Sequence, residues 1–240
     1  LKLSLMKNKL SILFMLIYCI NLKAQEKKTT FGLQYKPIIP AAYFNSSEII
    51  KDSNGYVFSL NPKYSNSFGM ILRQKINNTF SLESGLNYIQ RNYQLKIIKN
   101  TINLEAETFF GIRSYEVPLQ FLIYVRASKH WHLNVAFGIS HNVLTSDIKS
   151  YAEENTYFFQ NTYRKNGGYR ALLANVGMEY RTNKKGYYYI GTSLHRPWRE
   201  IARSYPEYND GVHIFNNESD FFLEMLGSFI TIDLRYFFAE

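Results

Sequence analysis

Apolar and polar residues alternate along eight separate stretches of this chain. The pattern is clearest around the turn at residues 77–78, where each flanking stretch carries apolar residues on one face and polar or charged residues on the other. Strict alternation predicts β-strands, and a very short polar turn between two of them predicts an antiparallel hairpin. The predicted strands cover residues 31–36, 67–76, 80–91, 115–126, 131–140, 172–181, 188–194 and 230–238.

The connections between these strands are alternately long and short. The short ones lie at residues 77–78, 127–130 and 182–186, and the long ones, predicted as loops, lie at 38–55, 93–111, 145–166 and 196–221. Transmembrane β-barrels have short turns on the periplasmic side and longer loops outside, and an even strand number closes the sheet. The pattern therefore predicts an all-β fold, an eight-stranded antiparallel up-and-down transmembrane β-barrel in the outer membrane of a bacterial cell.

Periodicity alone leaves a soluble, lipocalin-like barrel as an alternative, because either barrel carries one apolar and one polar face. Composition adds that 17% of the residues are aromatic, which is typical of β-sheets. Aromatic residues near the strand ends favour the membrane barrel, since such residues form girdles at the lipid headgroups. They are Tyr35, Tyr88, Tyr115, Trp131, Tyr180, Tyr188 and Tyr236.

The first 24 residues predict a secretory signal peptide. Basic residues precede an apolar run over residues 10–20, and Ala24 supplies a small residue before the expected cleavage. Met6 is an alternative start that yields the same mature chain. Residues 25–240 are then one outer-membrane β-barrel domain, whose expected partners are outer-membrane lipids and the barrel-insertion machinery.

The single cysteine, Cys19, lies inside this apolar run, after residues too bulky for a lipoprotein cleavage site. Its removal with the signal peptide leaves no thiol for a disulfide, a metal site or a nucleophile. The net charge of +9 includes the lysines of the signal peptide, and the remainder is too small to indicate nucleic-acid binding by an exported protein. We expect no cofactor, no metal and no nucleic-acid partner.

Two parts of the sequence resemble a known family. Residues 114–119 (SYEVPL), followed after a turn by residues 133–139 (LNVAFGI), look like the central hairpin of the small PorT-like outer-membrane β-barrel protein family. Residues 234–238 (LRYFF) resemble the closing strand by which such barrels are recognised for insertion. The resemblance covers essentially the whole mature chain and implies the same barrel fold. For some members it also implies a place in secretion or surface machinery.

In such a barrel the polar face of each strand turns inward. An eight-stranded barrel has room only for its own side chains, so its inward acids and bases are expected to pair across the lumen. A filled lumen disfavours transport, and a small-solute channel is kept as a further alternative function. The predicted lumen network comprises Arg73, Glu83, Arg91, Glu116, Arg126, Glu179, Asp233 and Arg235.

Ser193 and His195 are the best candidates for a catalytic pair. They share the inward face of the seventh strand, yet side chains at this spacing lie about 7 Å apart and need a bend to bond directly. The histidines and acids elsewhere lack metal-ligand spacing. We therefore predict no catalytic residue and no metal site. An outer-leaflet lipid-modifying or ester-hydrolysing barrel enzyme that uses this pair remains the alternative.

The third and fourth predicted loops are rich in aromatic and basic residues, the types that anchor interfaces. They are candidates for binding a protein partner or lipopolysaccharide, or they extend the strands upward and pack their own aromatics together. The leading functional hypothesis is a non-enzymatic structural, adhesion or accessory subunit of a cell-surface or secretion assembly. The candidate partner-binding residues are Tyr157, Phe158, Phe159, Trp198, Arg199 and Arg203.

Overall fold

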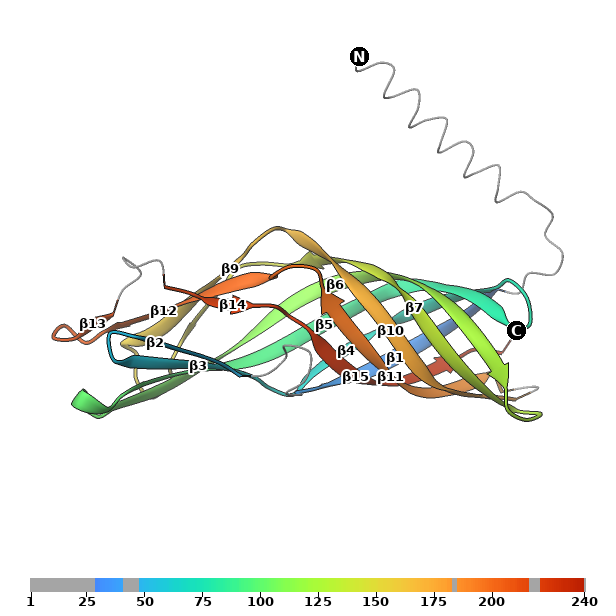
Figure 1. The fold of residues 1–240 in the computed structure, drawn as a ribbon, viewed down its shortest axis with the longest axis horizontal. Helices are drawn as coiled ribbons and strands as arrows, with labels where there is room; N and C mark the ends of the chain where they lie inside the picture. The colour runs from blue at the N-terminus through green and yellow to red at the C-terminus, as the bar shows by residue number, and fades with distance from the viewer. Residues whose placement is uncertain (1–28, 41–47, 183–184, 216–220, 240) are drawn as a thin grey trace, which may run out of the picture.

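Eight strands pair into a closed ring that forms the trunk of the molecule (Figure 1). Each of these eight strands is the antiparallel neighbour of the one before it in the sequence, and the first strand pairs with the last. The predicted eight-stranded up-and-down barrel is therefore confirmed. Its strands are β1 (Thr29–Ile39), β4 (Ser65–Lys75), β5 (Phe80–Lys99), β6 (Leu104–Arg126), β7 (Trp131–Leu144), β10 (Gly168–Arg181), β11 (Tyr187–Pro197) and β15 (Phe229–Phe237).

The structure, a computed structural model, describes residues 29–40, 48–182, 185–215 and 221–239. The predicted signal peptide, its cleavage site and Cys19 lie outside the described residues. Within the described part of the chain, no helix is long and apolar enough to cross a membrane.

The alternation places an apolar face outside the barrel and a polar face inside it. Leu33 on β1 and Met70 on β4 are register partners that point outward, with 51% and 60% of their surface exposed. The residues that point inward are polar instead. Gln34, which follows Leu33 on β1, is buried, and so is Arg73 on β4. A soluble barrel has the opposite arrangement, so the exposed apolar band is the surface that meets lipid.

Aromatic side chains border this band at both edges. The ring centroids of Trp131 and Tyr180 lie 4.9 Å apart near the short turns, and those of Tyr88 and Tyr115 lie 5.8 Å apart at the other edge. Two such girdles are expected where a barrel passes through both headgroup layers. The end with the short turns, where the C-terminus also lies (Figure 1), is accordingly the periplasmic end.

The long segments predicted as loops are mostly strands, so that prediction was wrong and the alternative of upward strand extension is confirmed. Polar residues that suggested loops occupy strand positions: Thr162, for example, is buried and donates a hydrogen bond to Gln160 at 2.5 Å. β5 and β6 continue beyond the barrel and turn at η1 (Asn100–Ile102). The additional strands are β2 (Ile49–Ser53), β3 (Tyr56–Pro62), β8 (Ile148–Tyr151), β9 (Phe158–Arg164), β12 (Ala202–Asn209), β13 (Ile214–Phe215) and β14 (Leu223–Met225).

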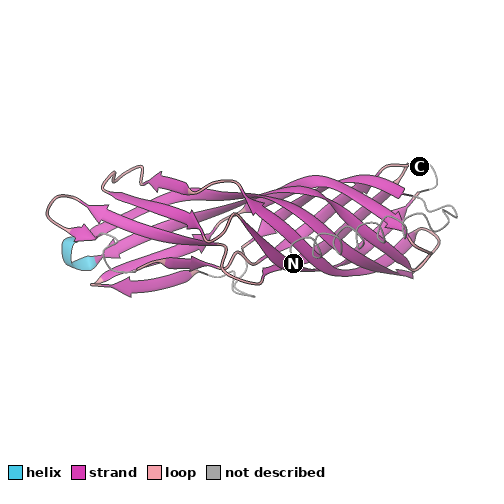
Figure 2. Cartoon of the chain, turned by 90° about the horizontal axis from the view of Figure 1, so that it is seen from above, coloured by secondary structure: helices cyan, strands magenta, loops and turns pink. Residues whose placement is uncertain are grey.

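These strands build an outer module in line with the barrel (Figure 2). We use this name for β2 and β3, which extend the barrel sheet beside β5, the outer halves of β5 and β6, and the second sheet of β8, β9, β12, β13 and β14. A hydrophobic core joins the two sheets, and Phe58 and Phe158 are fully buried in it. The ring of Phe58 lies 4.8 Å from that of Phe215 and 5.1 Å from that of Phe221. The outer module is therefore a packed unit.

Replacing Phe58 by Ala should destabilise the outer module by about 3–5 kcal/mol, because the change leaves a cavity among buried rings. We expect faster cleavage of the outer strands by protease added to vesicles that carry the folded protein. The matched control is Phe109→Ala, since Phe109 is 56% exposed on the same module. Equal cleavage rates for the two variants would show that the core does not hold the sheets together.

Candidate functional site

A chain of alternating charges fills the periplasmic half of the barrel interior. Register explains part of it, because Arg73 on β4 lies directly opposite Glu83 on β5, and Asp233 and Arg235 are two residues apart on the same face of β15. Such side chains must point into one lumen. The chain of charges, which we call the lumen network, runs through Lys36, Asp233, Arg235, Glu83, Arg73, Glu179 and Arg181.

Arg73 bonds two carboxylates from different sides of the barrel. Its Nε and Nη2 donate to Oε2 of Glu83 at 3.1 and 3.0 Å, and its Nη1 donates to Oε2 of Glu179 at 2.5 Å. The guanidinium also lies 3.7 Å from the ring centroid of Phe237. All of these charges are nearly or fully buried, so each depends on its partners for compensation.

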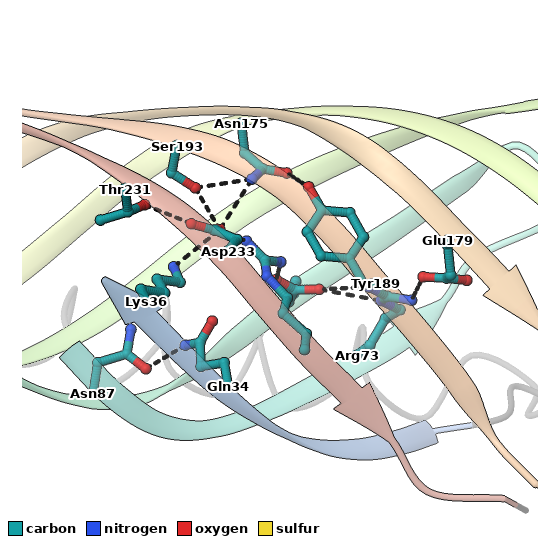
Figure 3. A network of polar contacts seen from close by, with 12 residues as sticks. Gln34, Lys36, Arg73, Asn87, Asn175, Glu179, Tyr189, Ser193, Thr231 and Asp233 are labelled. Atoms are coloured by element: carbon teal, nitrogen blue, oxygen red, sulfur yellow. Dashed lines mark hydrogen bonds and ion pairs between the residues drawn. The ribbon is translucent and has the colours of Figure 1, made fainter. Parts of the chain in front are cut away.

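Asp233 is the second centre of the network (Figure 3). Its Oδ2 accepts hydrogen bonds from Ser193 Oγ at 2.6 Å, Asn175 Nδ2 at 3.1 Å and Arg235 Nη2 at 2.6 Å. The ammonium of Lys36 lies 3.6 Å from the same oxygen. Asp233 thereby ties together four neighbouring strands of the ring: β1, β15, β11 and β10.

The outer half of the lumen holds a separate group of polar residues. Oε2 of Glu116 accepts a hydrogen bond from Asn87 at 2.8 Å, while its Oε1 lies 3.4 Å from His195 Nε2 without hydrogen-bond geometry. Arg91 donates to the carbonyl oxygen of Gly227 at 3.2 Å and forms no ion pair with the described residues. Arg91 and Glu116 therefore lie in the lumen as predicted, but outside the network of paired charges.

Arg126 does not belong to the network, and this part of the prediction was wrong. It is the last residue of β6, its side chain is exposed, and its Nε donates to the carbonyl oxygen of Ser128 at 3.1 Å. Alternation fails at the strand end, because Val125 and Arg126 are both exposed. Conversely, Lys36 and Arg181 join the network. The alternation places them on the inward face, and only the contacts identify their partners.

Ser193 and His195 make separate contacts. The Ser193 hydroxyl donates to Asp233, and the imidazole of His195 stacks on Phe229 with centroids 4.3 Å apart and planes at 8°. Within the described residues, neither ring nitrogen of His195 has a hydrogen-bond partner, and His195 is only 3% exposed. A serine activated by a histidine needs a direct bond between the two, and this arrangement lacks it.

Phe158 is buried in the core of the outer module and is not available to a partner, so its selection as a partner-binding residue was wrong. Register explains the difference: alternate residues of β9 face the core, and Phe158 and Gln160 are among them. Phe159 faces outward, and its ring lies 5.5 Å from that of Tyr151. Tyr151, an aromatic residue of the third predicted loop that was not selected as a partner-binding candidate, lies beside Phe159 on this surface.

The other predicted partner-binding residues lie at the surface. Tyr157 and Trp198 are 55% and 54% exposed, and Arg199 is also exposed. Arg203 is half-buried, because its guanidinium lies over the ring of Phe222, 4.2 Å from the centroid. In the described residues no cluster of His, Cys, Asp and Glu has an arrangement that suits a metal ion.

Comparison with known proteins bears on the fold. A family model described as an outer membrane protein beta-barrel domain matches residues 24–195. The chain is similar to the solved structure of the outer membrane protein OprG from Pseudomonas aeruginosa, with 12% identity and a TM-score of 0.55 over 89% of this chain and 98% of that one. It also aligns with outer membrane protein W of E. coli, with 11% identity and a TM-score of 0.33 over 89% and 100% of the two chains. No curated protein sequence matches. The likeness to OprG concerns the fold alone.

Replacing Glu83 by Gln should destabilise the barrel by about 3–5 kcal/mol, since it leaves two buried guanidinium groups without their shared carboxylate. Urea-induced unfolding in vesicles, followed by the mobility difference between folded and unfolded barrel on unheated gels, measures the loss. Glu105→Gln is the control, because Glu105 is exposed and pairs with Lys96 at the surface. That change should cost about 0–1 kcal/mol. Similar losses in both variants would contradict a role of the network in stability.

Proposed function

Because this chain belongs to the outer membrane protein beta-barrel domain family and lies in the bacterial outer membrane, we propose that it acts as a non-enzymatic, non-conducting scaffold. Its barrel anchors the outer module, and the outer module presents a binding face to a protein partner at the cell surface. The narrower likeness to PorT-like barrels is part of this proposal, and it favours an accessory subunit of a secretion or surface assembly.

The observation that carries the proposal is the outward face of the second sheet. Register puts Tyr163 beside Arg203 and Tyr151 beside Phe159 on the side away from the core. Aromatic and arginine side chains at the surface are the types most often found at the centre of protein interfaces. We call this the aromatic face, and it comprises Lys149, Tyr151, Phe159, Tyr163, Arg203, Tyr205 and Phe222.

The aromatic face is already ordered in the free protein. The rings of Tyr163 and Tyr205 lie 5.7 Å apart, and Lys149 lies over Phe159 at 4.7 Å from its centroid. Arg203 bonds Glu200 at 2.8 Å, which fixes the guanidinium over the face. Side chains held in place before binding lose less conformational entropy when a partner docks. A rigid face of this kind suits a stable partner rather than a transient one.

The lumen network supports the absence of conduction. A small-solute channel needs a continuous aqueous path. In this barrel a row of bonded side chains lies in the interior: Glu83 accepts hydrogen bonds from Arg73 and Arg235, and Arg235 also donates to Asp233. An interior of eight strands is just wide enough for such side chains. The separated contacts of Ser193 and His195 likewise favour a structural role for both residues over ester hydrolysis.

The binding proposal predicts that a companion protein is crosslinked to the outer module in intact cells in a fixed ratio. Tyr163→Ser combined with Tyr205→Ser should lower its recovery about tenfold or more, because two central aromatic contacts are lost. Phe109→Ser serves as the control, as Phe109 is an exposed aromatic of the other sheet. Undiminished recovery with the double variant, or an equal loss with the control, would count against the aromatic face.

The same proposal predicts that the purified barrel gives no discrete current steps in a planar lipid bilayer. Arg73→Ala combined with Glu83→Ala and Glu179→Ala removes the centre of the network and should allow steps to appear, provided that the variant still migrates as a folded barrel. Regular steps from the unmodified protein would overturn the non-conducting assignment and favour the channel.

A further inference from the structure

A pocket of about 460 Å³ opens on the outside of the barrel at its outer rim. It forms where β11 ends at Pro197 and the chain crosses through residues 198–201 to the second sheet. The pocket shares no lining residue with the lumen network, and it adjoins the aromatic face only through Glu200, which bonds Arg203. We call it the rim pocket, and its lining includes His141, Gly168, Arg170, Trp198, Arg199 and Glu200.

Register places the pocket at the outer edge of the lipid-facing band. Arg170 on β10 is the partner of His141 on β7, and the backbone N–H of Trp198 donates to the carbonyl oxygen of Arg170 at 3.1 Å. Two residues nearer the membrane, Leu172 and its partner Ile139 are 49% and 47% exposed on the same face. The basic side chains thus project where the apolar band gives way to the headgroup layer.

The positive charge of the pocket is not matched by the protein. Within the described residues, Arg170 and Arg199, which line the pocket, have no carboxylate at ion-pair distance. Arg196, which lies outside the lining and faces the same side as Leu172 on the neighbouring strand, has none either. These guanidinium groups are therefore free to bind an external anion.

Glu200 is the acid in the pocket lining, and its charge is already compensated. It forms ion pairs with Arg203, at 2.8 Å, and with Lys165. The hydrogen bonds from Arg203 hold the pKa of Glu200 below its usual range, so the carboxylate stays ionised and paired. It does not neutralise the arginines on the other side of the pocket.

Phosphate is the anion that suits this site. Guanidinium groups bind phosphate oxygens through paired, charge-assisted hydrogen bonds, and several arginines together give such binding both strength and geometry. Trp198, which is 54% exposed beside them, is a residue type that settles at the membrane interface. We propose that the rim pocket binds a phosphate group of lipid A, the anchor of lipopolysaccharide in the outer leaflet.

The side of the barrel formed by β1, β4 and β5 is aromatic at this edge. There β1, β4 and β5 present Tyr35, Phe68 and Tyr88, whose rings offer no guanidinium to a phosphate. A phosphate held on one side would orient the barrel relative to neighbouring lipid molecules. It would also set the height of the outer module above the membrane.

The test compares the binding of two forms of lipid A to the folded, full-length barrel in detergent micelles: the bisphosphorylated form and the same lipid after enzymatic removal of both phosphates. Native mass spectrometry gives the dissociation constants. The bisphosphorylated form should bind at least about tenfold more tightly, the order expected for loss of charge-assisted bonds to arginine. Equal dissociation constants for the two forms would overturn the proposal.

The variant Arg170→Gln with Arg199→Gln should abolish that difference, whereas Arg126→Gln should retain it, because Arg126 is an exposed arginine at the periplasmic rim. Arg199→Gln alone should reduce the difference if the double variant fails to migrate as a folded barrel. A preference that survives in folded Arg170→Gln with Arg199→Gln, or that is undiminished in Arg199→Gln where the double variant does not fold, would refute the assignment of the pocket.

Two competitors distinguish the source of the phosphate. Inorganic phosphate at millimolar concentration and phosphatidylglycerol at the same molar ratio as lipid A should both fail to displace the bound lipid. Displacement by inorganic phosphate would identify a site for free anions, and displacement by phosphatidylglycerol a site for anionic lipids in general. Either result would overturn the commitment to lipid A.

Discussion

Closure of the sheet is the constraint on which the rest of this structure depends. Inside a bilayer, no water is available to bond a free strand edge, so every backbone N–H and C=O group must find a partner within the protein. β1 and β15 supply the last of these partners, with register contacts from Gly32 opposite Phe237 to Ile39 opposite Ile230. Once the ring is closed with eight strands, its diameter is set, and so is the space left for side chains inside.

That small interior explains the ionic lumen. The alternation that gives lipid an apolar face gives the lumen a polar one, and the charges there have lost their water. Arg73 and Arg235 meet this cost by sharing Glu83, which accepts from both guanidinium groups. The same bonds tie together strands that are far apart in the sequence. A lumen crossed by these bonds is the basis of the proposal that the barrel does not conduct solutes.

The two surfaces proposed for binding accordingly lie on the outside of the barrel. The strands do not stop at the membrane, and the continuation of β5 and β6 gives the second sheet a core to pack against, with Phe58 at its centre. The aromatic face and the rim pocket both follow from the second sheet, since its crossing connection after Pro197 leaves Arg199 and Trp198 at the rim. The proposed phosphate site therefore lies on one side of the barrel, and the proposed protein-binding face lies on the outer module.

The eight strands, the inward charges and the short periplasmic turns were all predictable, because side-chain alternation has a period of two and needs no long-range information. The outer strands were not, because residues such as Gln160 and Thr162 are polar and become strand core only when a second sheet covers them. The sequence also did not predict that Arg73 is buried while Arg126 is exposed. Alternation places both on the inward face, and Arg126 is exposed because it lies at the end of its strand. By itself the sequence determined which face of each strand is polar and how many strands close the ring. The tertiary structure decided which charges meet and where free arginines gather, because those outcomes depend on the stagger between strands distant in the chain.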